Sequence, residues 1–118
     1  MLNQVVLVGR LVRNPELRTT DSNKNVTTIT LAIPRSFKNM NGEYDTDFVD
    51  CILWENTAKS TTEYCKKGDI IGIKGRIQSR IVEKDDDKKY LIEIIAEKVT
   101  FLSSTSKEKT DDLSVFLV

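Results

Sequence analysis

The chain has 118 residues, the size of one domain, and its 18 basic and 18 acidic side chains cancel to a net charge of zero. It contains no His and only two Cys, which excludes the common catalytic triads, a four-Cys zinc site and a disulfide-dense scaffold. No apolar run approaches the roughly 18 residues that cross a bilayer, and a secretory signal pattern is absent. We therefore expect one cytoplasmic domain with reduced thiols and no membrane association.

The charges are unevenly distributed along the chain. Residues 1–40 carry six basic and two acidic groups, 41–58 carry five acidic and no basic groups, and 59–82 carry six basic and two acidic groups. Local basic patches can therefore exist on a neutral protein. A mixed, solvated surface explains the same counts.

The N-terminal half shows the period-two alternation of β-strands. We predict a strand over 4–12, with Gly9 as a bend, and a second over 26–33, ended by Pro34. Asn41-Gly42 is a hairpin-turn signal, and a third strand follows over 47–54.

The C-terminal half begins with the one good helix candidate, residues 55–67, for which Asn56 or Thr57 is the expected cap and Gly68 the stop. Strands over 69–83 and 90–102 flank a charged turn over 84–89. Five strands with a short helix between the third and fourth predict an all-β, five-stranded Greek-key barrel, the oligonucleotide/oligosaccharide-binding (OB) fold. A β-sandwich is the alternative.

Two strand faces carry the candidate chemistry. In 47–54 the alternation places Phe48 and Trp54 on the face opposite the core residue Cys51. In 69–83 a basic set shares one face, namely Lys74, Arg76 and Arg80. The aromatic pair equally suits a subunit interface or a site beneath a loop, and single basic residues on strands are usually solvated.

Aromatic platforms beside cations suit single-stranded nucleic acid, because unpaired bases stack on rings while Lys and Arg follow the phosphates. Competing sites are weak. Asp85, Asp86 and Asp87 alternate in facing and precede two Lys, so they predict a hairpin tip rather than a metal site. Cys51 and Cys65 have no His partner and are expected to be buried or idle thiols.

The ordered segments of the chain resemble bacterial single-stranded DNA-binding proteins over about residues 1–102. The matching segments are NQVVLVGRL (3–11), NPELR (14–18), TITLAIPRSF (28–37), NGE (41–43), TDFVDCILW (46–54), EYCKKGD (63–69), IKGRIQSR (73–80) and EIIAEKVTFL (93–102).

The resemblance implies an OB-fold homotetramer that binds single-stranded DNA in replication, recombination, repair or DNA uptake. It implies no catalysis, no cofactor and no metal, and a nucleoid-associated location. The aromatics it matches to base stacking are Phe37, Phe48 and Trp54. The residues it matches to phosphate or polar contacts are Arg10, Arg18, Arg35, Lys67, Lys74, Arg76 and Arg80.

The chain departs from the family pattern in two places. A further stacking aromatic is usual two residues after the strand-four arginine, where this chain has Val82, and Tyr90 across the hairpin is the candidate replacement. The tail, 103–118, is expected to be flexible and is short. Its end resembles the family's partner-recruiting tip without the Pro of that tip, through Asp111, Asp112, Leu113 and Phe116.

The sequence thus predicts sequence-independent binding of single-stranded DNA by a barrel over 1–102. The rival hypothesis is an interaction module, a related barrel that mainly docks replication or recombination proteins. Retention of Trp54 and of the basic face of 69–83 favours DNA binding.

Overall fold

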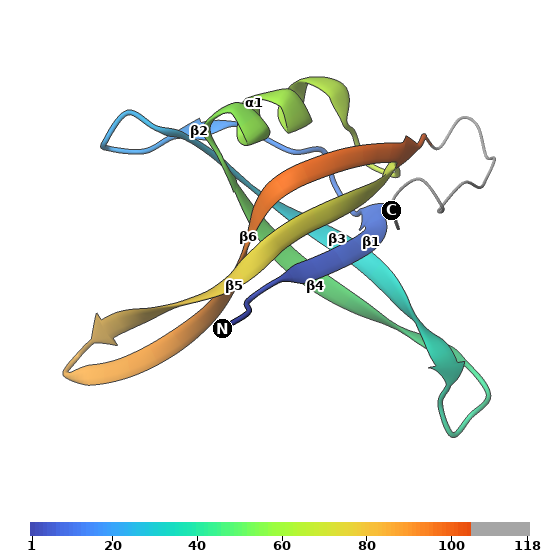
Figure 1. Cartoon of the computed structure of the whole chain (residues 1–118). Helices are drawn as coiled ribbons and strands as arrows, with labels where there is room; N and C mark the ends of the chain where they lie inside the picture. The colour runs from blue at the N-terminus through green and yellow to red at the C-terminus, as the bar shows by residue number, and fades with distance from the viewer. Residues whose placement is uncertain (105–118) are drawn as a thin grey trace.

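Five long strands close on themselves to form a barrel in the computed structural model, which describes residues 1–104 (Figure 1). The elements are β1 (Val5–Leu11), β2 (Arg18–Thr19), β3 (Asn25–Lys38), β4 (Tyr44–Trp54), α1 (Glu55–Tyr64), β5 (Ile70–Lys84) and β6 (Asp87–Ser103). The strands are hydrogen-bonded in the order β1-β5-β6-β4-β3-β2, and a β1–β3 pairing closes the barrel. The β4–β6 pair is parallel and the others are antiparallel. The expected OB fold is confirmed.

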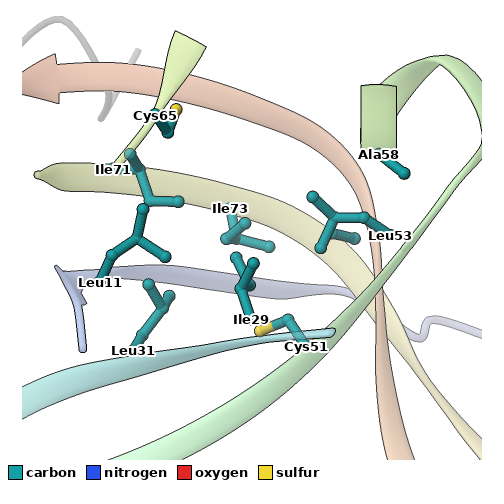
Figure 2. Packing of buried hydrophobic residues seen from close by; sticks show 10 residues of the cluster. Leu11, Ile29, Leu31, Cys51, Leu53, Ala58, Cys65, Ile71 and Ile73 are labelled. Atoms are coloured by element: carbon teal, nitrogen blue, oxygen red, sulfur yellow. The ribbon is translucent and has the colours of Figure 1, made fainter. Parts of the chain in front are cut away.

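The core lies inside the barrel, and strand alternation selects its residues. Leu7, Ile33 and Val49 pack at its margin, while α1 closes one end with Ala58 fully buried. Figure 2 shows the central side chains of this cluster gathered between the strands and the helix. The buried cluster consists of Leu11, Ile29, Leu31, Cys51, Leu53, Ala58, Cys65, Ile71, Ile73 and Ala96.

Two hairpins extend from the barrel as arms, and both are longer than the sequence predicts. The β3–β4 arm continues through Pro34 instead of ending there, and Pro34 still pairs with Thr46. The pairing of β3 with β1 ends at Ala32, so β3 is an edge strand here, where a residue without an N–H is tolerated. At its tip the Gly42 N–H donates to the Asn39 carbonyl at 3.0 Å, and Gly42 has a φ of +79°. The expected turn at Asn41-Gly42 is therefore present.

The β5–β6 arm depends on a β-bulge next to Gly75. Lys74 pairs with Lys98 but Gly75 pairs with Ala96, so Glu97 is the extra residue. A Cβ on Gly75 would lie 2.0 Å from the carbonyl oxygen of Ile95, which leaves room only for glycine. Beyond the bulge the arm leaves the barrel and turns at residues 85 and 86, both with positive φ.

The helix is shorter than the predicted span of 55–67, and it ends at Tyr64. Trp54 occupies the N-cap position without a side-chain hydrogen bond, so neither expected cap residue acts as one. Two hydrogen bonds hold the loop that follows: the Lys66 N–H donates to Asp69 Oδ2 within the loop at 2.9 Å, and the Gly68 N–H donates to the Leu11 carbonyl of β1 at 2.9 Å. Within residues 1–104, no helix is long and apolar enough to cross a membrane.

Candidate nucleic-acid interface

The outer face of β4 carries exposed aromatics, as the period-two pattern predicts. Phe48 is 67% exposed and Trp54 is 40% exposed, while the alternating residues Cys51 and Leu53 are fully buried. Tyr44, 57% exposed, extends the same row because the strand begins three residues before the predicted start at 47. Extending the alternation backward from Phe48 would have found this third ring.

Trp54 lies in a row that crosses three strands. It pairs with Val26 of β3, and Val26 pairs with Arg18 of β2, so the three side chains share one face. Val26 is 3% exposed, whereas its cross-strand neighbours Trp54 and Arg18 are both exposed. An aromatic ring and a guanidinium therefore flank a common apolar support.

The basic face of β5 continues this surface. Ile52 of β4 is in register with Ile95 of β6, and Ile95 pairs with Arg76 of β5, so these outward faces are contiguous. Arg80 follows Arg76 on the same side by alternation. One groove of about 370 Å³ crosses the joined strands, lined among others by Arg18, Thr28, Asp50, Ile52, Arg80 and Glu93.

Acidic side chains are built into the same surface. Arg80 Nε donates to Glu93 Oε2 at 2.6 Å, and Arg76 Nε lies 3.3 Å from Glu97 Oε2. Asp50 accepts a hydrogen bond of 2.5 Å from the Thr30 hydroxyl. Sequence reasoning missed Glu93 and Glu97, because their proximity to the arginines depends on the β5–β6 register.

Arg35 lies away from the face that carries Phe48. Its Nη2 donates to Asp47 Oδ1 at 2.9 Å, and Asp47 precedes Phe48 on a strand, where successive side chains point to opposite faces. The hydrogen bonds between them lower the pKa of the Asp47 carboxyl and raise that of the Arg35 guanidinium. Phe37, 64% exposed, lies farther out on the same arm.

Arg10 and Lys67 gather at the loop that follows α1, and neither lines the groove. Arg10 Nη1 donates to the Gly68 carbonyl at 2.7 Å, and the Lys67 backbone N–H donates to Asn14 Oδ1 at 2.7 Å. Lys74 is exposed on β5 opposite Val6 of β1, on the side of the barrel that carries the β1 edge.

Tyr90 does not replace the aromatic that is missing at Val82. Val82 pairs with Lys89 and shares the face of Arg80, whereas Tyr90 pairs with Ile81 on the opposite face of the arm. On that opposite face Ile81 is 55% exposed and Tyr90 71% exposed. The groove side of the arm therefore has an aliphatic side chain where the family pattern has a ring.

The thiols belong to the core, as expected. Burial, with a smaller contribution from Asp50, raises the pKa of Cys51 to about 11, and burial together with Asp69 raises the pKa of Cys65. Among residues 1–104, no three His, Cys, Asp or Glu side chains gather as metal ligands. The predicted partner tip, Asp111, Asp112, Leu113 and Phe116, lies outside the described residues.

A closed Greek-key barrel with exposed aromatics and arginines on one contiguous strand face is an OB-fold domain with the features of a nucleic-acid interface. Residues 2–102 match the model of the single-strand binding protein family, and the chain belongs to that family. The resemblance inferred from the sequence segments is confirmed.

Three named relatives illustrate the match. Single-stranded DNA-binding protein B of Bacillus subtilis (strain 168) is 45% identical over 113 residues, which cover 95% of this chain and 100% of that protein. Single-stranded DNA-binding protein 3 of Listeria innocua is 48% identical over 88% of this chain and 66% of its own length. Single-stranded DNA-binding protein 1 of Lactococcus lactis is 46% identical over 92% of this chain and 73% of its own length.

Proposed function

We propose that this protein binds single-stranded DNA without sequence preference and protects it during replication, recombination, repair or DNA uptake at the nucleoid. The observation that carries the proposal is the contiguous surface that joins Phe48 and Trp54 to Arg18, Arg76 and Arg80 across five strands. Family membership supports it. The proposed role involves no catalytic step, cofactor or metal.

The binding mode follows from the chemistry of this surface. Bases stack on Phe48 and Trp54, because every base has a π-face, and each stacked base contributes about 1–3 kcal/mol whatever its identity. The guanidinium groups of Arg18 and Arg80 contact the backbone phosphates on either side of the groove. Phe37 extends the track along the β3–β4 arm.

The remaining predicted contacts lie around the barrel rather than in the groove. Arg10, Arg35, Lys67 and Lys74 are exposed and are proposed to meet phosphates of a strand that passes beyond the joined face. A path of this kind requires the DNA to wrap the protein.

We propose assembly into a homotetramer through the β1 side of the barrel. From Val5 to Gly9, β1 pairs with β5 on one side, and its pairing with β3 is confined to residues 10 and 11. Val6 on this strand is 52% exposed. An open strand edge with an apolar side chain favours association. Val6→Glu should shift the sedimentation coefficient toward the monomer, and Tyr64→Glu on α1 should not.

The segment 103–118 is proposed to dock on a surface through its acidic and apolar residues, with the protein's own barrel favoured over a replication or recombination partner. Deleting residues 103–118 separates the two. Loss of thermal stability or tighter DNA binding supports docking on the barrel. Loss of partner capture alone supports recruitment.

Titration with poly-dT tests the main proposal. Trp54 is the one Trp of the chain, so its fluorescence reports directly on the proposed stacking site. We expect quenching that saturates with poly-dT, is unchanged by Mg²⁺ at constant ionic strength, and is much weaker with duplex DNA. A chain that shows no response and no binding to poly-dT would favour the protein-docking module.

A further inference from the structure

Arg76 and Arg80, two of the three arginines on the proposed DNA track, are each paired with a glutamate of β6. Arg80 Nε donates to Glu93 Oε2 at 2.6 Å, and Arg76 Nε lies 3.3 Å from Glu97 Oε2. In both pairs the glutamate on β6 lies two residues beyond the residue that pairs directly with the arginine on β5. A four-residue repeat of arginines is thus matched by a four-residue repeat of glutamates.

The two pairs are positioned by different features of the arm. Glu93 has a side chain only 16% exposed at the groove, so its carboxylate is held close to Arg80. Glu97 is the extra residue of the bulge that Gly75 permits, and the bulge turns its side chain toward Arg76. The register of β6 with β5 therefore positions both carboxylates beside the arginines.

A carboxylate and a DNA phosphate compete for the same donors. Both are anionic oxygen acceptors that bind guanidinium N–H groups, and Glu93 occupies the Nε of Arg80, so a phosphate that uses this donor must displace or share the carboxylate. The Arg76 side chain is 41% exposed and that of Arg80 is 54% exposed, so an incoming strand can reach both.

We propose that Glu93 and Glu97 compete with the DNA phosphates for Arg76 and Arg80. The two glutamates hold these arginines in the free protein and so set the affinity and the salt dependence of DNA binding. The inference rests on the proposed function and concerns the regulation of that same surface. When DNA binds, each arginine exchanges its glutamate for a phosphate, and the released carboxylate takes up a cation from solution. That uptake offsets part of the cation release that drives binding to a polyanion.

Neutral variants of the glutamates should therefore bind DNA more tightly and with steeper salt dependence. An ion pair whose arginine is half-exposed to solvent contributes little, so we expect Glu93→Gln to lower the Kd for dT oligomers by roughly two- to fivefold. The slope of log K against log salt should steepen by up to about 0.7, the share of one phosphate contact on a single strand. Glu97→Gln should act in the same direction.

A matched control separates this effect from the simple loss of one negative charge. Glu63→Gln changes the net charge equally on α1, and the ion pairs of Arg76 and Arg80 do not involve Glu63. A double-mutant cycle adds specificity: Glu93→Gln introduced into an Arg80→Ala protein should have no more effect than Glu63→Gln. Affinity is measured by anisotropy of labelled dT over a range of NaCl concentrations, and thermal unfolding checks that each variant is folded.

The outcomes are distinct. Tighter binding and a steeper slope for Glu93→Gln and Glu97→Gln, beyond the control and dependent on Arg80, support the inference. Equal behaviour of all three variants overturns it, and so does weaker binding, which would show that the carboxylates position the arginines. If the wild-type chain binds dT and Trp54→Ala weakens that binding, these failures leave the proposed function intact.

Discussion

Replacing Trp54 with Ala tests the stacking site most directly. Trp54 is 40% exposed, so part of the indole is available to a base while the rest packs on the barrel, in a row with Val26 and Arg18. Stacking contributes about 1–3 kcal/mol per base, so Trp54→Ala should raise the Kd for dT oligomers by roughly 5- to 150-fold. Trp54→Phe keeps a ring and should lose much less.

The assay must not depend on Trp54 itself, because the variant has no Trp. Anisotropy of labelled dT measures the Kd for both proteins, and urea unfolding measures stability, since removal of the ring also uncovers Val26, now 3% exposed. A change in stability without a change in Kd would assign Trp54 to packing. An unchanged Kd for a folded Trp54→Ala protein would refute the stacking role and the reasoning from strand faces that led to it.

Three further predictions test other parts of the structure. Val82→Trp adds a ring on the groove face and should tighten dT binding by up to about 3 kcal/mol, measured by an anisotropy titration. Tyr90→Ala, on the opposite face, should leave the Kd unchanged. Gly75→Ala should lower the free energy of unfolding in urea by about 1–3 kcal/mol, because its Cβ would lie 2.0 Å from a backbone oxygen; an unaltered midpoint would contradict the bulge. Burial raises the pKa of Cys51 from the ordinary thiol pKa of 9.0 to about 11, so the folded state favours the neutral thiol. The free energy of unfolding should therefore decline as the pH rises from 9.0 toward about 11, and Cys51→Ala should flatten that decline. Cys65 should resist alkylation at pH 8 until urea is added.

Strand periodicity predicts on which face of a strand a side chain lies wherever this depends only on alternation along that strand. In β4 the alternation is unbroken, so the buried positions of Cys51 and Leu53 and the exposed rings of Phe48 and Trp54 follow from the sequence alone. The hairpin at Asn41-Gly42 was also predictable, since a tight turn requires a residue that tolerates positive φ.

Features that depend on pairing register could not be predicted in the same way. Arg35 forms an ion pair with Asp47 and so lies away from Phe48, and it stands in the part of β3 where the register with β4 shifts beyond Pro34. The proximity of Glu93 to Arg80 likewise depends on long-range strand pairing. The resemblance matched Arg35 and Arg80 to the same kind of contact, but their geometries differ: one lies on the outer arm and the other lines the groove.

The neutral net charge of a protein proposed to bind a polyanion has a structural explanation. The acidic run over 41–58 is largely engaged within the β3–β4 pair, where Asp45 and Asp47 contact Arg35 and Asp50 accepts from Thr30. Arg35 offsets part of this acidic charge, and the rings of Phe48 and Trp54 stay exposed. A surface of this kind depends more on stacking and less on net positive charge than a strongly basic protein does. This protein should therefore keep much of its affinity for dT at salt concentrations that release a protein bound mainly by phosphate contacts. Comparing the salt dependence of the two Kd values measures how much of the binding free energy comes from stacking.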